Sequence, residues 1–347
     1  MISAERLDAP ASPVACGVHP PDLLEAIGPQ RRDEPLLARR VRFHQSWYRA
    51  AVLGIQQYGE TAGRTPRRLG SVLTDADALD GRNFSSPSAR RFYDRRRSEG
   101  WGVDPVRCTK YLTSSQALTL NLLGPLEESP VWAARVLGEV LQRTDIDVVR
   151  RVWVEFAPRR RSEYLNDMTR VDALVAMGTS RGEELLAVEI KYSDRFNSRR
   201  VDIDRAPYRD LAESSGLWRD ADSTLREPQV NQLVRCHALA AAVSGDLTGR
   251  PAAPTMLVLH HTDDVTSRGL VDGYVGHLAD PTLVKAATLD EFVGILRRSA
   301  RSAAQRAVAR DLELRYVAES ESEAVWQMSD DRSVRARRDG GRPHSRR

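Results

Sequence analysis

The chain has 347 residues, 41% of them hydrophobic and 29% charged, and a formal net charge of +4. These values are typical of a globular protein with a sizeable core, and they exclude a chain that is disordered throughout. The small positive charge permits a nucleic-acid partner without requiring one. Arginine supplies almost all of the 52 basic residues, because only Lys110, Lys191 and Lys285 are lysines.

The cysteines and the hydropathy pattern limit the class of protein further. Cys16, Cys108 and Cys236 are scattered, and their odd number and spacing predict neither a disulfide framework nor a zinc ribbon. The sequence has no apolar run near the roughly 18–20 residues that span a bilayer, and its N-terminus lacks the pattern of a signal peptide. We therefore expect a cytoplasmic protein with no membrane partner.

The N-terminal region, residues 1–105, carries weak patterns and is expected to be mostly helical or irregular. Residues 1–30 are rich in Pro, Ala and Gly and predict an irregular lead-in, whereas residues 34–59 place apolar side chains at helical intervals. The stretch 81–100, GRNFSSPSARRFYDRRRSEG, permits two interpretations. It forms arginine and aromatic contacts to a nucleic acid, or it forms a solvated helix with two buried rings. We expect the whole region to supply substrate contacts or a dimer surface.

The middle of the chain predicts an α/β domain. Residues 111–126 predict a helix, and Ser129 followed by Pro130 predicts the start of the next one. Three strands are then predicted by segments rich in β-branched and aromatic residues, at 147–158, 170–178 and 184–193.

A helix from about residue 228 and a buried strand over 253–261 complete this pattern. The order helix, three strands, helix, strand is an αβββαβ core with a mixed sheet and helices on its faces, which we assign to residues 106–300. Beyond it, Thr288 and Glu291 form a capping-box pattern that predicts a long C-terminal helix reaching through 301–327.

The last residues, 328–347, are basic and almost without large apolar side chains. This composition predicts a disordered tail, which is either a solvated end or a source of weak, salt-sensitive affinity for nucleic acid.

Charged residues on the second and third predicted strands suggest a reactive site. Side chains alternate across a strand, so Glu189 and Lys191 share one face. The midpoint between Asp172 and Glu189 falls inside the turn predicted between Gly178 and Gly182. A symmetric hairpin therefore places the two carboxylates nearly opposite each other. Such like charges repel, and a divalent cation offsets the repulsion better than Lys191 does.

This arrangement predicts hydrolysis of phosphodiester bonds with Mg²⁺, for which Mn²⁺ would substitute. Asp172, Glu189 and the backbone carbonyl of Ile190 offer the hard oxygen ligands that Mg²⁺ prefers. A bound metal would lower the pKa of a water, and Lys191 would orient that water and stabilise the transition state. The structural alternative is a Glu/Lys ladder on a surface strand. Both strands are otherwise apolar and lysine is rare in this chain, which favours the catalytic interpretation.

The motif resembles that of the restriction-endonuclease-like, or PD-(D/E)XK, nuclease superfamily, whose common core is αβββαβ. Asp172 matches the aspartate of the second strand, Glu189 and Lys191 match the E-x-K of the third, and Val171 stands where the motif has proline. Over about residues 80–240 the chain is similar to an uncharacterised bacterial branch with an SSQ-x-L-x-x-N-x-x-GPL segment. The carrying segments are GRNFSSPSARRFYDRRR, TSSQALTLNLLGPL, VEFAP, RVDALVAM and AVEIKYSDRF. This resemblance implies a metal-dependent nuclease.

The resemblance also implies further site residues. Many superfamily members have another acidic residue on the first core strand, where Glu155 stands, and polar residues on the following helix, where Gln232 and Arg235 lie at i,i+3. Glu155 is expected to join the catalytic carboxylates, or else to form an ion pair at the rim. Gln232 and Arg235 are expected to contact nucleic acid, or else to belong to an ordinary polar helix face.

The expected substrate is double-stranded DNA, and the expected role is restriction or anti-phage defence. A homodimer or a partner subunit of a defence system would suit this role. The alternative is a catalytically silent nucleic-acid-binding or scaffold protein that keeps the nuclease fold.

Overall fold

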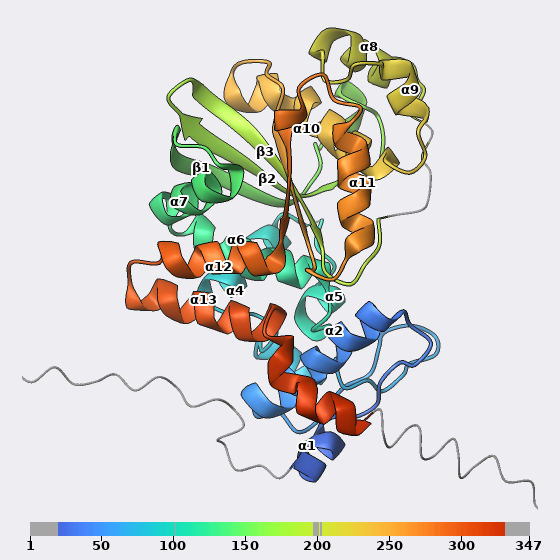
Figure 1. Ribbon diagram of the computed structural model, residues 1–347, viewed down its shortest axis with the longest axis vertical. Helices are drawn as coiled ribbons and strands as arrows, with labels where there is room; N and C mark the ends of the chain where they lie inside the picture. Colours follow the sequence, from blue (N-terminus) through green and yellow to red (C-terminus); the bar gives the residue numbers. More distant parts are fainter. Residues whose placement is uncertain (1–19, 101, 197–200, 202, 330–347) are drawn as a thin grey trace, which may run out of the picture.

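The computed structural model describes residues 20–329 except for 101, 197–200 and 202. Its centre is a five-stranded mixed sheet in the order β1-β2-β3-β4-β5, in the upper half of Figure 1. Antiparallel pairing joins β1, β2 and β3, and parallel pairing joins β3, β4 and β5. The strands are β1 (Ile146–Phe156), β2 (Val171–Thr179), β3 (Gly182–Lys191), β4 (Thr255–His260) and β5 (Val284–Thr288).

The β2–β3 hairpin has the register that the sequence predicts. Pairing runs from Thr179↔Gly182 to Ala173↔Val188, so residues 180–181 form the turn. Gly182 has a φ of +113°, a conformation that few residues other than glycine adopt. Thr179 Oγ1 donates to the carbonyl of Gly182 at 2.9 Å and closes the turn. This short connection decides which positions of the two strands face each other further along the hairpin.

The connection from β3 to β4 makes the sheet mixed. The chain forms α8 (Ala206–Ser215), α9 (Ala221–Arg226) and α10 (Asn231–Thr248) before β4 lies parallel to β3. The predicted αβββαβ core is therefore confirmed. The sequence does not predict β5, because VKAAT is short and rich in alanine. It becomes a strand because α11 (Val265–Val275) returns the chain to the edge of β4.

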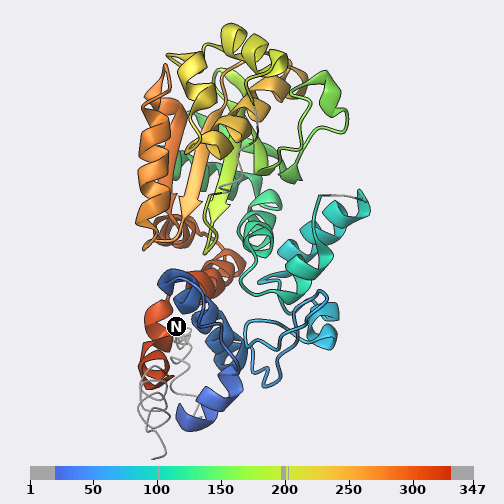
Figure 2. The same ribbon diagram turned by 90° about the vertical axis from the view of Figure 1, so that its right-hand side faces the viewer.

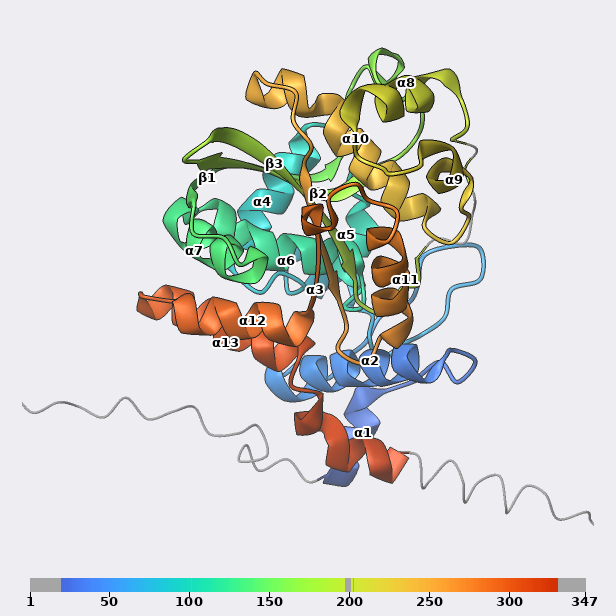
Figure 3. The same ribbon diagram turned by 45° about the horizontal axis from the view of Figure 1, so that its top comes forward.

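Helices cover both faces of the sheet (Figures 1 and 3). One face packs against α6 (Ser115–Glu127), α7 (Pro130–Leu141) and α12 (Leu289–Ser299), with Val188 and Ile190 of β3 in that core as predicted. The opposite face, with Leu174 and Ala187, packs against α8, α10 and α11. The side of β3 that carries Glu189 is therefore also covered by helices.

The N-terminal segment corrects one expectation. A helix, α1 (Pro20–Ile27), lies within the stretch 1–30 that composition predicts to be irregular, and residues 1–19 lie outside the described residues. In the lower half of Figure 2, the N-terminal helices lie beside the C-terminal segment. Ile27 and Phe43 share a small core with Val325, and this contact between distant parts of the chain stabilises α1.

The helix predicted over 34–59 is shorter than expected. It comprises α2 (Leu36–Trp47) and a π-helical turn over Tyr48–Val52. Three further helices follow, α3 (Asp75–Leu79), α4 (Pro87–Ser98) and α5 (Pro105–Lys110).

In the stretch 81–100, the two rings of α4 are buried, as the interpretation of this stretch as a solvated helix with two buried rings predicts. Phe92 and Tyr93 of α4 are buried in the core beneath the sheet, so these two rings do not contact nucleic acid. Arg96, one turn further along α4, is also buried.

The C-terminal region also differs from the prediction. The capping box of Thr288 and Glu291 is present and begins α12, but the helix ends at Ser299. A second capping box, formed by Ser302 and Gln305, begins α13 (Ala303–Tyr316). Two helices therefore replace the single long one, and a 3₁₀ turn over Glu319–Ser322 follows. Of the predicted tail 328–347, residues 330–347 lie outside the described residues.

Candidate active site

Three carboxylates form a row across β1, β2 and β3. The β1–β2 pairs on either side, Val154↔Ala173 and Phe156↔Val171, place Glu155 opposite Asp172. The last β2–β3 pair, Ala173↔Val188, places Asp172 beside Glu189 in the same way. We call Glu155, Asp172 and Glu189 the acidic row.

Asp172 lies just beyond the last backbone pair between β2 and β3, where its side chain takes the place of a backbone acceptor. Its Oδ2 accepts a hydrogen bond from the backbone N–H of Ile190 at 2.8 Å, and the residue keeps partial contact with solvent. Burial raises its pKa well above the ordinary value, and repulsion by Glu189 raises it further, although Lys191 and the Ile190 N–H oppose the shift. Asp172 is therefore a carboxylate whose charge needs compensation.

Glu189 is 1% exposed and is held by three donors. Lys191 Nζ and Gln232 Nε2 donate to its Oε1 at 2.7 and 2.6 Å, and Cys236 Sγ lies 3.6 Å from its Oε2. Gln232 and Cys236 are four residues apart on α10, so they project from one side of the helix towards β3. Burial, followed by the charge of Glu189, raises the pKa of Cys236, so the sulfur is a neutral thiol that donates.

Lys191 is the charged partner of the acidic row. Burial is the largest single influence and lowers its pKa, but the charges of Glu189 and Asp172 and the hydrogen bond to Glu189 together outweigh burial and raise the pKa above the ordinary value for lysine. Its Nζ also lies 4.8 Å from the centre of the Phe196 ring. The ammonium group is therefore protonated at neutral pH, which makes Lys191 a hydrogen-bond donor and an electrostatic stabiliser but not a proton acceptor.

Glu155 has an unusual backbone conformation that Arg96 supports. Its φ is +48°, in the left-handed region that costs a non-glycine residue about 1–3 kcal/mol. Arg96 Nε donates to the carbonyl of Val154 at 2.7 Å, and Arg96 Nη2 donates to the carbonyl of Glu155 at 2.9 Å. One buried guanidinium therefore holds the end of β1 in the conformation that presents Glu155 to the row.

The side chain of Glu155 is held by Gln116 of α6. The Gln116 Oε1 accepts from the backbone N–H of Asp104 at 3.0 Å and from the Cys108 thiol at 3.5 Å, which leaves its NH₂ group to donate to the Glu155 carboxylate. Burial nonetheless raises the pKa of Glu155 to about 7, and the charge of Glu189 adds to the shift. Glu155 therefore exchanges its proton near neutral pH.

These side chains suit a divalent cation that keeps part of its water shell. With all groups ionised, the acidic row and Lys191 carry a net charge of about −2. Among the described residues, no three Asp, Glu, His or Cys side chains are grouped closely enough to hold a metal ion. Mg²⁺ is commonly bound by one or two carboxylates, with waters and substrate phosphate completing its shell. Asp172 and Glu189 fit that requirement, with Glu155 next to them.

The two predicted nucleic-acid contacts on α10 donate hydrogen bonds within the protein. Gln232 donates to Glu189. Arg235 is buried, with its Nε donating to Asn231 at 3.1 Å and its Nη1 to Thr169 at 3.0 Å. Their contact with nucleic acid stays a prediction.

Sequence reasoning missed three residues that hold the row: Arg96, Gln116 and Cys236. Two of them could have been found from the sequence: Gln116 lies in the SSQ segment that carries the family resemblance, and Cys236 follows the predicted site residue Gln232 by one helical turn. Arg96 could not, because it is one of many arginines in an arginine-rich stretch.

Comparison with known families agrees with this geometry. The family model described as the PD-(D/E)XK nuclease superfamily matches residues 31–318, which include the whole acidic row. The chain belongs to the PD-(D/E)XK nuclease superfamily. Membership indicates a nuclease that acts on nucleic acid, and nucleases of this superfamily generally use divalent metals. The match extends beyond the predicted core, 106–300, at both ends, and the domain boundaries stay a prediction.

Comparisons with curated proteins and with solved structures gave no match. Within the described residues, none of the helices combines the length and apolar character needed to cross a membrane.

Proposed function

We propose that this superfamily member is a Mg²⁺-dependent nuclease that hydrolyses phosphodiester bonds in DNA, with Mn²⁺ able to replace Mg²⁺. The observation that carries the proposal is the pairing of Asp172 with Glu189 on adjacent strands, with Lys191 Nζ 2.7 Å from Glu189. An ordinary surface ladder does not explain it, because Glu189 and Lys191 are both buried. Burying two like charges is costly unless a cation compensates them.

Each side chain has a proposed role. Asp172, Glu189 and the backbone carbonyl of Ile190 would hold the metal, whose chemistry is to supply a water of lowered pKa and to neutralise charge on the phosphate. The ammonium of Lys191 donates to the attacking water and to the phosphate oxygens, which gain charge in the transition state. Gln232 and Cys236 keep the Glu189 carboxylate in its orientation before substrate binds, Cys236 continues to do so afterwards, and Glu155 completes the catalytic group.

The biological setting is proposed from the family. We propose double-stranded DNA as the substrate, cytoplasmic action in restriction or anti-phage defence, and either a homodimer or a partner subunit. Gln232 and Arg235 are proposed to contact the substrate by exchanging their present hydrogen bonds for bonds to phosphate.

A specific observation favours the second candidate, a catalytically silent nucleic-acid-binding or scaffold protein. Both oxygens of Glu189 already have donors, from Lys191, Gln232 and Cys236. A nuclease binds metal through the one acceptor site that these three donors leave or by displacing a donor, whereas a scaffold keeps the whole network.

The test combines cleavage with metal binding. Supercoiled plasmid, single-stranded DNA and RNA are incubated with the wild type, Asp172→Asn and the control Asp222→Asn, in roughly 5 mM Mg²⁺, Mn²⁺ or EDTA. In the Asp172→Asn variant, the side-chain amide still offers an oxygen to the Ile190 N–H. The control position, Asp222, is 74% exposed.

We expect the wild type and the control to cleave in Mg²⁺ and Mn²⁺ but not in EDTA, and the Asp172→Asn variant to be inactive and to bind Mn²⁺ more weakly in calorimetry. A wild type that neither cleaves nor binds metal would favour the scaffold.

A further inference from the structure

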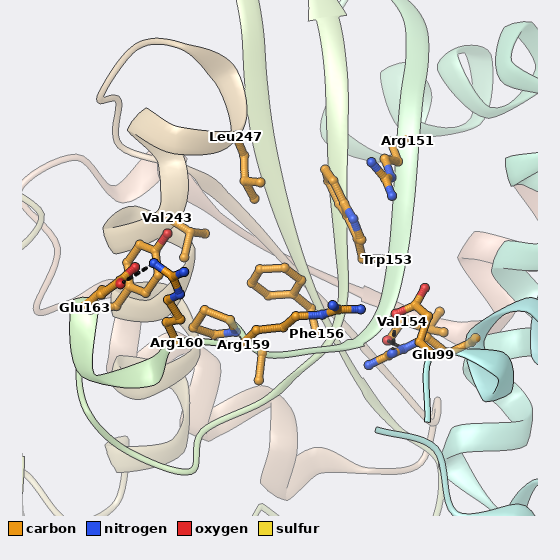
Figure 4. Close-up of a pocket in the computed structure, with 14 residues that line it drawn as sticks. Glu99, Arg151, Trp153, Val154, Phe156, Arg159, Arg160, Glu163, Val243 and Leu247 are labelled. Atoms are coloured by element: carbon orange, nitrogen blue, oxygen red, sulfur yellow. Dashed lines mark hydrogen bonds and ion pairs between the residues drawn. The ribbon is translucent and has the colours of Figure 1, made fainter. Parts of the chain in front are cut away.

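A cavity beside β1 has the surroundings of a binding site. It encloses about 670 Å³ between the edge of β1, the loop after it and the C-terminal half of α10. Figure 4 shows Trp153 and Phe156 of β1 together with Val243 and Leu247 of α10 around this space. The two rings meet edge to face with centres 6.0 Å apart, and both remain partly exposed. We call this space the β1 cavity.

The charged residues around the β1 cavity make it electropositive. Four arginines line it, and its two acidic residues are engaged with two of these: Glu99 with Arg96 and Glu163 with Arg160. The remaining two, Arg151 and Arg159, are exposed, and no acidic partner is found for either in the described part of the chain. The Arg151 guanidinium lies 5.0 Å from the centre of the Trp153 ring. The β1 cavity thus combines aromatic faces with uncompensated positive charge.

The β1 cavity lies next to the acidic row. Arg96 lines it and at the same time donates to the carbonyl of Glu155. Trp153 pairs with Leu174, which lies in the same core as α10, and is two residues from Glu155 along the strand, a separation of about 7 Å. A group stacked on Trp153 is therefore about one nucleotide away from the carboxylates.

We propose that the β1 cavity is a subsite for an unpaired nucleotide of the strand that the acidic row cleaves. This inference rests on the proposed nuclease function and narrows its substrate from duplex DNA in general to DNA in which the cleaved strand is unpaired and its bases are unstacked at the point of cleavage. The base stacks on Trp153 and Phe156, and Arg151 and Arg159 bind the flanking phosphates. Duplex DNA cannot offer a base face to Trp153 unless one nucleotide leaves the helix, whereas a single strand offers one directly.

The test measures binding without cleavage. Fluorescence anisotropy in EDTA follows a labelled single strand, the same strand with one abasic position, and the blunt duplex. The variants are Trp153→Leu and Trp153→Phe. The control is Trp326→Leu, a partly exposed tryptophan that also lies under an arginine but is remote from the β1 cavity. Thermal unfolding of each variant establishes that it is folded.

Loss of one stacked base weakens binding by roughly 5- to 150-fold. We expect Trp153→Leu to weaken single-strand binding within this range and to change duplex binding less than about twofold. The variant should bind the intact strand and the abasic strand with equal affinity, because it has no ring on which the additional base can stack. Trp153→Phe restores binding, and Trp326→Leu is unaffected.

Equal losses for single strand and duplex, or no loss for either, would overturn the subsite. If the wild type cleaves with metal while Trp153→Leu weakens single-strand and duplex binding equally, or weakens neither, only the subsite fails. If the wild type binds no nucleic acid and cleaves none, the proposed function fails with it.

Discussion

Replacement of Glu155 by glutamine should stabilise the metal-free protein in a pH-dependent way. The unfolded chain releases the Glu155 proton near the ordinary pKa of 4.5, whereas burial raises the pKa in the folded protein to about 7. Between these values the unfolded state binds fewer protons, so the stability of the wild type falls as the pH rises through this range. The difference corresponds to about 3 kcal/mol once the pH is well above 7. Glutamine carries no proton to lose and avoids this penalty.

Urea unfolding in EDTA measures the effect. We expect Glu155→Gln to exceed the wild type in free energy of unfolding by about 1 kcal/mol near pH 5.5 and by about 3 kcal/mol near pH 8.5. The control Glu183→Gln replaces a glutamate of β3 whose side chain is 41% exposed, and its difference from the wild type should not grow with pH. A Glu155→Gln variant that is no more stable than the wild type near pH 8.5 would refute the argument that Glu155 is buried against other carboxylates.

Three further predictions concern buried polar groups. Burial lowers the pKa of His237 to about 4. The stability that depends on neutral His237 is therefore fully present above the ordinary histidine pKa of 6.5 and is lost as the pH falls towards 4. Between about pH 7 and pH 5, the free energy of unfolding in urea should fall by roughly 2 kcal/mol less for His237→Gln than for the wild type. An equal fall would argue against a buried, neutral His237. Burial raises the pKa of Cys108 and Cys236, so iodoacetamide should label neither in the native protein and both in urea; rapid native labelling, read by mass spectrometry, would contradict this. Arg49 is fully buried and donates to several backbone carbonyls, so Arg49→Met should lower the free energy of unfolding by about 3 kcal/mol, and a loss below about 1 kcal/mol would disagree.

The sequence predicts the centre of the molecule well because its information is local there. The alternation of side chains and the glycines at the β2–β3 turn suffice to place Asp172 beside Glu189 without any knowledge of the tertiary fold. The capping box at Thr288 is equally local, since two residues three apart form it. The strands of the αβββαβ core follow from their own β-branched and aromatic residues.

Features that depend on distant contacts could not be predicted. α1 forms against Val325, almost at the other end of the described chain, and β5 forms because β4 offers it an edge. The support of Glu155 by Arg96 and Gln116 joins three separate elements, so no spacing in the sequence indicates it. The sequence predicts helices on the faces of the sheet, but it does not predict that α10 supplies Gln232 and Cys236 as hydrogen-bond donors to Glu189.

The most direct test of the central claim, that Lys191 and the acidic row form a metal-dependent nuclease centre, is a comparison of two lysine variants. Lys191→Met removes the buried ammonium of β3, and Lys285→Met removes a lysine of β5, two strands away in the sheet. Cleavage of labelled DNA under single-turnover conditions gives the rate of each with Mg²⁺ and with EDTA. We predict that the wild type and Lys285→Met cleave with Mg²⁺ alone, and that Lys191→Met is slower by about 100-fold or more while still folded. Wild-type rates for folded Lys191→Met, or cleavage that persists in EDTA, would contradict the claim.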